Sequence, residues 1–276
     1  MNPGEMNPVE MKSVAYTWPA EEGGSAETVF SDLTLSVPKG VNFLVGPNGI
    51  GKSTFLLLAG GRIFPDSGAV SILGTDTARY GDAPFDPALE QERNQLVSFV
   101  YQNMEFETDA PIGEVFKMVA AGARDPRRAD EVRPTLEKAA ELLERRSVRM
   151  HELSKGEMQR AIVVMSLLYG SPVVMMDEPV FAVEWYRAEA LLTAVREHCA
   201  ASETTVCISA HDVELARRFA DHVVLFDTDR TVEVGAPEDL LSRDRLEQAF
   251  RAPYNTLYER QNLYRQLLTK SLDDTG

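Results

Sequence analysis

The sequence predicts an α/β fold with a parallel core sheet, an antiparallel β subdomain and an α-helical insertion. A first apolar run, Val41–Val45, leads through a glycine-rich loop into a second, Phe55–Ala59, which is the order strand, turn, helix. Two more short apolar runs, Val173–Met176 and Thr205–Ile208, have the composition of strands buried on both faces. Such strands separated by helical segments predict a parallel sheet with right-handed crossovers.

The glycine-rich loop has the spacing of a phosphate-binding loop. Its glycines let successive backbone N–H groups point inward at an anion, and the helix start behind it adds unpaired donors and the positive end of a dipole. We expect Lys52 to reach the β- and γ-phosphates of a nucleotide and the Ser53 hydroxyl to ligate Mg²⁺. A glycine-rich loop that merely precedes a helix is the alternative, and the flanking strand and helix argue against it. The candidate binding residues are Gly46, Pro47, Asn48, Gly49, Ile50, Gly51, Lys52, Ser53 and Thr54.

Two carboxylates end the second apolar strand, and a proline follows where the strand should stop. At the carboxyl end of a parallel strand, Asp177 would face the phosphate-binding loop and hold Mg²⁺ through coordinated water. Glu178, one residue further, is placed to polarise an attacking water as general base. Asp-Glu-Pro could also be an ordinary exposed corner, but a phosphate-binding loop earlier in the chain favours the catalytic interpretation.

The run 153–160, Leu-Ser-Lys-Gly-Glu-Met-Gln-Arg, resembles the signature motif of the ATP-binding cassette (ABC) ATPases, Leu-Ser-Gly-Gly-Gln. Ser154 and Gly156 match that motif, a lysine replaces the first glycine, and Glu157 replaces the glutamine. Ser154 should cap a helix that runs to Leu168, and Ser-x-x-Glu is also a common capping box. The resemblance assigns Ser154, Gly156 and Glu157 to the nucleotide site, with the Glu157 carboxylate expected to point away from the phosphates.

Other segments resemble landmarks of the same family. His211, after the strand at 205–208, matches the switch histidine that reaches the γ-phosphate. Gln102 matches the Q-loop glutamine, which contacts Mg²⁺ and water. Trp18 takes the place of the aromatic residue that stacks on adenine, although Tyr16 is a second candidate and one of the two could be core. The stretch 181–184, Phe-Ala-Val-Glu, departs from the usual D-loop and leaves the dimer contacts open.

Composition agrees with this interpretation. The chain has 276 residues, 44% of them hydrophobic, enough for a large core. A formal charge of −15 argues against binding nucleic acid, and the absence of eighteen consecutive apolar residues argues against direct membrane insertion. The N-terminus shows no secretory signal, and Cys199 and Cys207 have no metal-like spacing. We therefore expect a cytoplasmic protein that reaches the inner face of the cell membrane through a partner.

The motif positions suggest the domain organisation. Residues 1–247 should form the ABC ATPase domain, with a helical subdomain at about 104–158, and residues 248–276 a C-terminal helical tail. Residues 11–45 and 67–75 should supply the antiparallel β subdomain. Apolar residues at helical spacing predict a helix from Val132 to Arg145.

The resemblance covers roughly residues 11–247 and implies a mechanism. In this family two ATPs are held between two subunits, each ATP by one phosphate-binding loop and the opposite signature, and separate transmembrane permease subunits carry the cargo. The stretches 115–126 and 235–250 resemble importer cassettes for metal chelates, haem and cobalamin. An exporter ATPase subunit and a soluble ABC ATPase of iron–sulfur cluster assembly stay open as alternatives. A DNA-repair cassette would need a long coiled coil that does not fit between the motifs.

Overall fold

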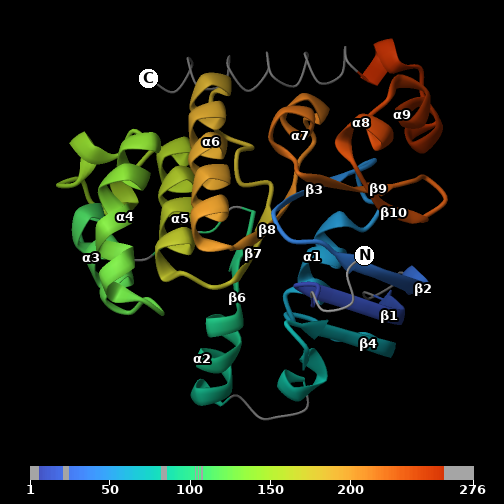
Figure 1. Cartoon of the computed structure of the whole chain (residues 1–276), viewed down its shortest axis with the longest axis horizontal. Helices are drawn as coiled ribbons and strands as arrows, with labels where there is room; N and C mark the ends of the chain where they lie inside the picture. Colours follow the sequence, from blue (N-terminus) through green and yellow to red (C-terminus); the bar gives the residue numbers. More distant parts are fainter. Residues whose placement is uncertain are drawn as a thin grey trace.

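The computed structural model describes residues 6–20, 25–81, 86–102, 104, 106 and 108–257. It contains two sheets (Figure 1). The first is antiparallel, in the order β2-β1-β4-β5, and consists of β1 (Val9–Trp18), β2 (Glu27–Val37), β4 (Ser67–Ile72) and β5 (Thr75–Asp76).

The second sheet is mainly parallel, in the order β10-β9-β3-β8-β7-β6, with only the pair β9–β10 antiparallel. Its strands are β3 (Val41–Val45), β6 (Val97–Val100), β7 (Val173–Asp177), β8 (Thr205–Ser209), β9 (His222–Phe226) and β10 (Val232–Gly235). The predicted α/β fold class is confirmed. One boundary was wrong: residues 41–45 do not extend the antiparallel sheet but lie inside the parallel one, where β3 is buried at every residue and pairs with β8 along one edge and with β9 along the other.

Two hydrophobic clusters lie on opposite faces of the parallel sheet, and alternate side chains of β3 belong to one cluster or the other. Val41, Phe43 and Val45 belong to one cluster and Leu44 to the other. Helix α1 (Lys52–Ala59) packs in the cluster of Leu44, where it contacts β7 and β8 of the parallel sheet and β1 and β4 of the antiparallel one. α1 therefore lies between the two sheets, and the loop that precedes it is fixed by both.

Helices cover the other face of the parallel sheet (Figure 1). There α3 (Ile112–Ala121), α4 (Pro126–Ala139) and α5 (Lys155–Tyr169) pack on one another, and α6 (Trp185–Ser202) and α7 (Val213–Phe219) lie beside them. The helix predicted at 132–145 is shifted towards the N-terminus. Asp125 caps α4 and Pro126 opens it, and the chain turns at Glu141, where φ is +54°.

The remaining helices are short and lie at the edges. Helix α2 (Pro87–Leu96) precedes β6, and α8 (Pro237–Leu240) and α9 (Arg243–Phe250) follow β10. Helix α9 crosses the predicted domain boundary at residue 247, and Tyr254 and Leu257 pack against the main core. From residue 258 onward the predicted tail lies outside the described residues. The division into 1–247 and 248–276 stays a prediction.

Candidate functional site

The loop between β3 and α1 has the backbone that the sequence predicted for holding an anion. Gly51 adopts φ +113°, and a Cβ there would lie 2.5 Å from a methyl carbon of Val29. A Cβ on Gly46 would lie 2.7 Å from the Cβ of Phe226. Neither position has room for a side chain, so the backbone of the loop packs closely against the neighbouring strands. The groups that the loop offers to an anion are therefore its backbone N–H donors.

The ammonium of Lys52 lies inside this loop, where it donates to the backbone carbonyls of Gly46 and Pro47, both at 2.8 Å. Burial lowers the pKa of Lys52 to about 8. The carboxylates of Glu178 and Asp177 act in the opposite direction and raise this pKa, but burial has the larger effect. A buried cation held only by neutral carbonyls would gain from an anionic partner. The residues present therefore fit a nucleotide phosphate, and the acidic end of β7 is near enough to act on the same lysine.

Asp177 and Glu178 lie at the carboxyl end of β7, as predicted. Among the described residues no three His, Cys, Asp or Glu side chains gather into a metal site. Mg²⁺ bound with a nucleotide needs few protein ligands, since it keeps waters and takes oxygens from phosphates. Asp177, half-buried, and Ser53, exposed at the start of α1, offer such oxygens, so the donor set fits magnesium bound together with a nucleotide.

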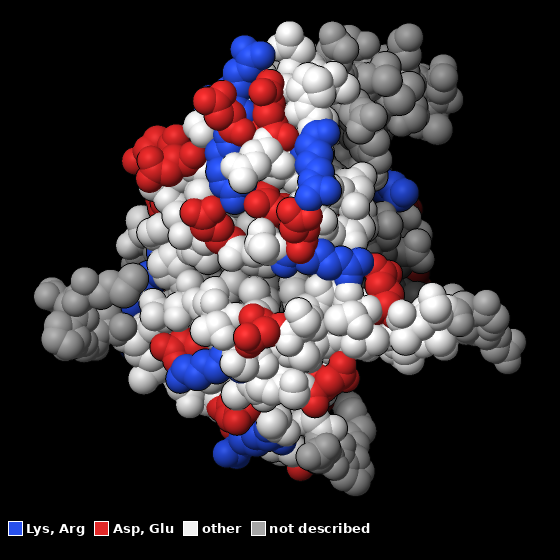
Figure 2. All heavy atoms as spheres, turned by 90° about the vertical axis from the view of Figure 1, so that its right-hand side faces the viewer, with Lys and Arg blue, Asp and Glu red and all other residues white. Residues whose placement is uncertain are grey.

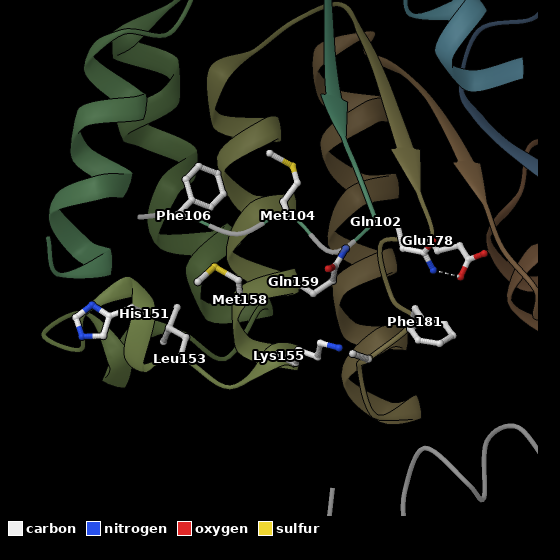
Figure 3. Close-up of a pocket in the computed structure, with 11 residues that line it drawn as sticks. Gln102, Met104, Phe106, His151, Leu153, Lys155, Met158, Gln159, Glu178 and Phe181 are labelled. Carbon is white, nitrogen blue, oxygen red and sulfur yellow. Dashed lines mark hydrogen bonds between the residues drawn. The ribbon is translucent and has the colours of Figure 1, made fainter. Parts of the chain in front are cut away.

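The three predicted catalytic residues meet at one carboxylate. Glu178 contacts the imidazole Nε2 of His211 through Oε1. Through Oε2 it accepts a hydrogen bond from Gln102 Nε2 at 3.0 Å (Figure 3). These side chains follow β7, β8 and β6, three parallel strands that end at the same edge of the sheet. Glu178 is only 13% exposed at its side chain, so a water held there would be largely shielded from solvent.

The two aromatic candidates at the end of β1 differ in exposure. Tyr16 is buried at 8%, whereas Trp18 is 37% exposed and stands edge-on to it, with 5.0 Å between ring centroids. Trp18 Nε1 donates to the hydroxyl of Thr54 in α1 at 3.1 Å. Tyr16 is therefore core, and the exposed indole lies directly beside the phosphate-binding loop, the position that suits base stacking.

The start of α5 forms the capping box that the sequence allowed. Glu157 Oε2 accepts from the backbone N–H and the hydroxyl of Ser154, both at 2.9 Å, and Arg145 Nε lies 2.7 Å from Oε1. Burial acts to raise the pKa of Glu157, but the bonds from Ser154 and Arg145 outweigh it and hold that pKa below its usual value. We expected this carboxylate to point away from bound phosphates. In the structure it folds back onto the Ser154 hydroxyl, and its charge is balanced by Arg145.

Comparison with known proteins places these motifs in one family. The family model described as "ABC transporter" matches residues 30–181, more than half of the chain. The chain belongs to the ABC transporter family. It is an ATPase cassette of that family.

A cobalt import ATP-binding protein, CbiO, of Rhodobacter capsulatus is 35% identical over 216 residues, which cover 76% of this chain and 74% of that protein. An energy-coupling factor transporter ATP-binding protein, EcfA2, of Methanospirillum hungatei is 29% identical over 97% of this chain. That alignment covers 64% of EcfA2, so this chain spans less than two thirds of that relative. A solved ATP-binding subunit of an ABC transporter superposes with a TM-score of 0.71 at 24% identity, covering 91% of this chain and 98% of that one, which confirms the cassette fold.

A pocket of about 320 Å³ opens beside Gln102 and Glu178 of this ABC cassette. Gln102 and Glu178 lie at one end, and the rest of the lining mixes apolar side chains, among them Met104, Phe106 and Met158, with the polar side chains of His151 and Lys155 (Figure 3). The lining residues are Gln102, Met104, Phe106, His151, Leu153, Lys155, Met158, Gln159, Glu178, Phe181 and Ala182.

Two residues of the cassette site were not found from the sequence. Ser209, the last residue of β8, hydrogen-bonds both Asp177 and Glu178, and Arg145 neutralises Glu157. A polar residue at the carboxyl end of a buried strand was a visible signal for Ser209. Nothing in the sequence pointed to Arg145, because a 3₁₀ turn and a loop bring it to the signature helix.

Proposed function

We propose that this chain binds ATP and Mg²⁺ at the loop 46–54, hydrolyses ATP together with a second cassette subunit, and thereby drives import through a separate permease. The convergence of Gln102, Glu178 and His211 beside the Lys52 loop carries the proposal. Family membership supports the ATPase activity, and the arrangement of these four side chains supports their roles.

Each residue has a distinct task in the proposed reaction. Lys52 and the backbone N–H groups of its loop hold the β- and γ-phosphates, and the exposed face of Trp18 takes the adenine. Ser53, Asp177 and Gln102 would hold Mg²⁺, which neutralises phosphate charge when bound.

Hydrolysis itself falls to the carboxylate and the histidine. Glu178 accepts a hydrogen bond from the attacking water and thereby polarises it, and His211 orients that water against the γ-phosphate. In the structure His211 and Gln102 occupy the two oxygens of Glu178. Each carboxylate oxygen can accept a second hydrogen bond, so an attacking water can reach the base while sharing it with these two side chains.

We infer a second subunit from the resemblance of the signature to that of the ABC family, and in this chain α5 packs on the opposite face of the parallel sheet from α1. Ser154, Gly156 and Glu157 at the start of α5 would meet the ATP held by the loop of the other subunit, homologous or identical. ATP would then stabilise the closed pair, and loss of phosphate would release it, which is a ligand-driven population shift. The altered D-loop at 181–184 lies in the turn between β7 and α6, next to the pocket lining.

The permease would dock at the pocket beside Gln102. Met104, Phe106, Leu153 and Met158 give it an apolar wall, which suits a short amphipathic helix of a membrane subunit. None of the helices in the described ranges is long and apolar enough to cross a membrane. On the face shown in Figure 2, lysines and arginines are interspersed with acidic side chains. That face offers no gathered basic surface among the described residues. We assign attachment at the inner face of the membrane to the permease subunits.

For the cargo we propose a chelated metal or a similar small molecule. The similarity to a cobalt import cassette supports this choice, together with the importer-like stretches at 115–126 and 235–250. Uptake of labelled cobalt, iron chelate, haem, zinc and cobalamin should be measured in a gene-deletion strain carrying either the parent gene or Glu178→Gln. We expect one uptake to be lost on deletion and restored only by the parent gene. Unchanged uptake of all five would contradict import and favour an exporter.

A further inference from the structure

The hydroxyl of Ser209 links the two acidic residues at the end of β7. It donates to Asp177 Oδ1 at 2.5 Å and accepts from the backbone N–H of Glu178 at 2.9 Å. Ser209 pairs with Asp177 in the parallel register of β7 and β8, so the sheet itself brings them together. The residue is 1% exposed, and solvent cannot replace either hydrogen bond.

The peptide that Ser209 holds is conformationally unusual. Glu178 adopts φ +49°, the left-handed region that residues with a Cβ occupy at a cost. This turn of the backbone directs the Glu178 side chain towards Gln102 and His211 instead of along the strand direction. Two hydrogen bonds hold this turn: the Glu178 N–H donates to the Ser209 hydroxyl, and the Phe181 N–H donates to the Glu178 carbonyl at 3.2 Å.

Ser209 also lies two residues before His211 on the same segment. One short stretch of chain therefore carries the histidine that contacts Glu178 Oε1 and the hydroxyl that fixes the Glu178 backbone. Any displacement of this stretch relative to β7 would move the histidine and the base together. The Asp177 carboxylate, with Oδ1 engaged by Ser209, keeps its other oxygen for a further partner.

We propose that Ser209 is a positioning residue of the ATPase site, which fixes the Glu178 backbone for water activation and orients Asp177 towards Mg²⁺. The proposal rests on the proposed roles of Asp177 and Glu178. It assigns Ser209 no contact with ATP, so its removal should act on turnover and on the use of Mg²⁺ but leave the phosphate-binding loop intact.

The test compares Ser209→Ala with Ser171→Ala. Ser171 is fully buried and donates to the carbonyl of Asn94 at 2.7 Å, so its removal deletes a similar buried hydrogen bond away from the site. We expect both variants to lower the urea midpoint of unfolding, and Ser209→Ala by at least as much as Ser171→Ala, because Ser209 makes two buried hydrogen bonds and Ser171 makes one. Only Ser209→Ala should lower kcat, on the order of 10- to 100-fold, with KM for ATP nearly unchanged, because a catalytic group is displaced rather than a binding group lost.

A second measurement avoids turnover. ATP binding is titrated against Mg²⁺ by calorimetry in the Glu178→Gln background, with and without Ser209→Ala. We expect Ser209→Ala to raise the Mg²⁺ concentration needed for half-maximal binding severalfold and to leave binding in EDTA unchanged. Ser209→Thr, which keeps the hydroxyl, should restore kcat and the Mg²⁺ requirement. If Ser209→Thr does not fold, the comparison of Ser209→Ala with Ser171→Ala tests the proposal by itself.

Parent kcat and Mg²⁺ requirement in Ser209→Ala would overturn the proposal, and so would an equal loss of kcat in Ser171→Ala. Glu178→Gln, assayed in parallel, separates the two levels. If Glu178→Gln is inactive while Ser209→Ala is normal, only the role of Ser209 fails. If Glu178→Gln hydrolyses ATP normally, the proposed function of the site fails, and the role of Ser209 with it.

Discussion

The carboxylate of Glu178 and the imidazole of His211 contact each other, although they follow two different strands, β7 and β8. The contact brings the expected general base and the expected γ-phosphate sensor into one cluster before any nucleotide is considered. Gln102 closes the cluster from β6. We propose that hydrolysis depends on this cluster of three side chains, and the following variants test that proposal.

Glu178→Gln should bind ATP with near-parent affinity but nearly stop hydrolysis, because an amide cannot polarise the attacking water. A lost general base costs about 10²- to 10⁴-fold in rate. We also expect an ATP-bound dimer on size exclusion with Mg²⁺, measured alone and with any partner cassette. Glu238→Gln, at an exposed glutamate in α8, is the matched control and should behave as the parent does. Hydrolysis at the parent rate in Glu178→Gln would remove Glu178 from the role of base.

His211→Ala should lose most hydrolysis, because the variant removes the side chain expected to contact the γ-phosphate and to orient the attacking water. The expected loss in kcat is on the order of 10²-fold. His151→Ala is a suitable control for the isolated ATPase, since His151 is exposed and lies at the far end of the pocket (Figure 3). Equal rates in the two histidine variants would show that the contact with Glu178 is only structural.

Arg145→Ala should slow hydrolysis more than Glu157→Gln does. The Arg145–Glu157 pair balances a carboxylate that lies on the Ser154 hydroxyl, so removing the arginine leaves an unpaired negative charge beside the expected phosphate position. Glu157→Gln should change the rate by less than about threefold, as expected for loss of a partly exposed pair. The double variant should recover the rate of Glu157→Gln, measured as steady-state ATPase. A manyfold increase in Glu157→Gln would instead show that the site is naturally attenuated.

ATP binding should weaken at alkaline pH. Burial places the pKa of Lys52 at about 8, and a bound phosphate would raise it, so above that pH the free protein must take up a proton to bind. Below it, Lys52 is charged in both states and contributes no pH dependence. The affinity should fall by up to about tenfold per pH unit above the free-state pKa, with proton uptake visible by calorimetry in buffers of different ionisation enthalpy. Lys52→Arg should show no such dependence, and a flat profile in the parent would contradict the account.

Local patterns predicted much of this site because the chemistry is local. The loop 46–54, the acidic end of β7 and the serine cap of α5 each depend on neighbours within a few residues, and the structure has each of them. The assignment of β3 failed because a five-residue apolar strand suits either sheet. Its place was decided by long-range pairing, since β3 pairs with β8 along one edge and with β9 along the other.

Long-range contacts could not be predicted in the same way. Ser209 reaches Asp177 only because β7 and β8 are adjacent in register, and the sequence does not state that adjacency. The choice between Tyr16 and Trp18 also needed the packing of β1 on α1, which buries one ring and leaves the other beside Thr54. Strand register determined the contact between Ser209 and Asp177, and packing determined which of the two aromatic rings is exposed. Residue spacing in the sequence could not predict either feature.

The most direct test of the central claim is ATP binding and hydrolysis by Lys52→Ala. Lys52 is the buried cation of the phosphate-binding loop, and alanine removes the fixed partner of the β- and γ-phosphates. Calorimetry and steady-state phosphate release should show ATP binding and turnover in the parent, greatly weakened binding in the variant and no detectable hydrolysis there. Near-parent hydrolysis by Lys52→Ala would contradict the assignment of residues 46–54 as the ATP site.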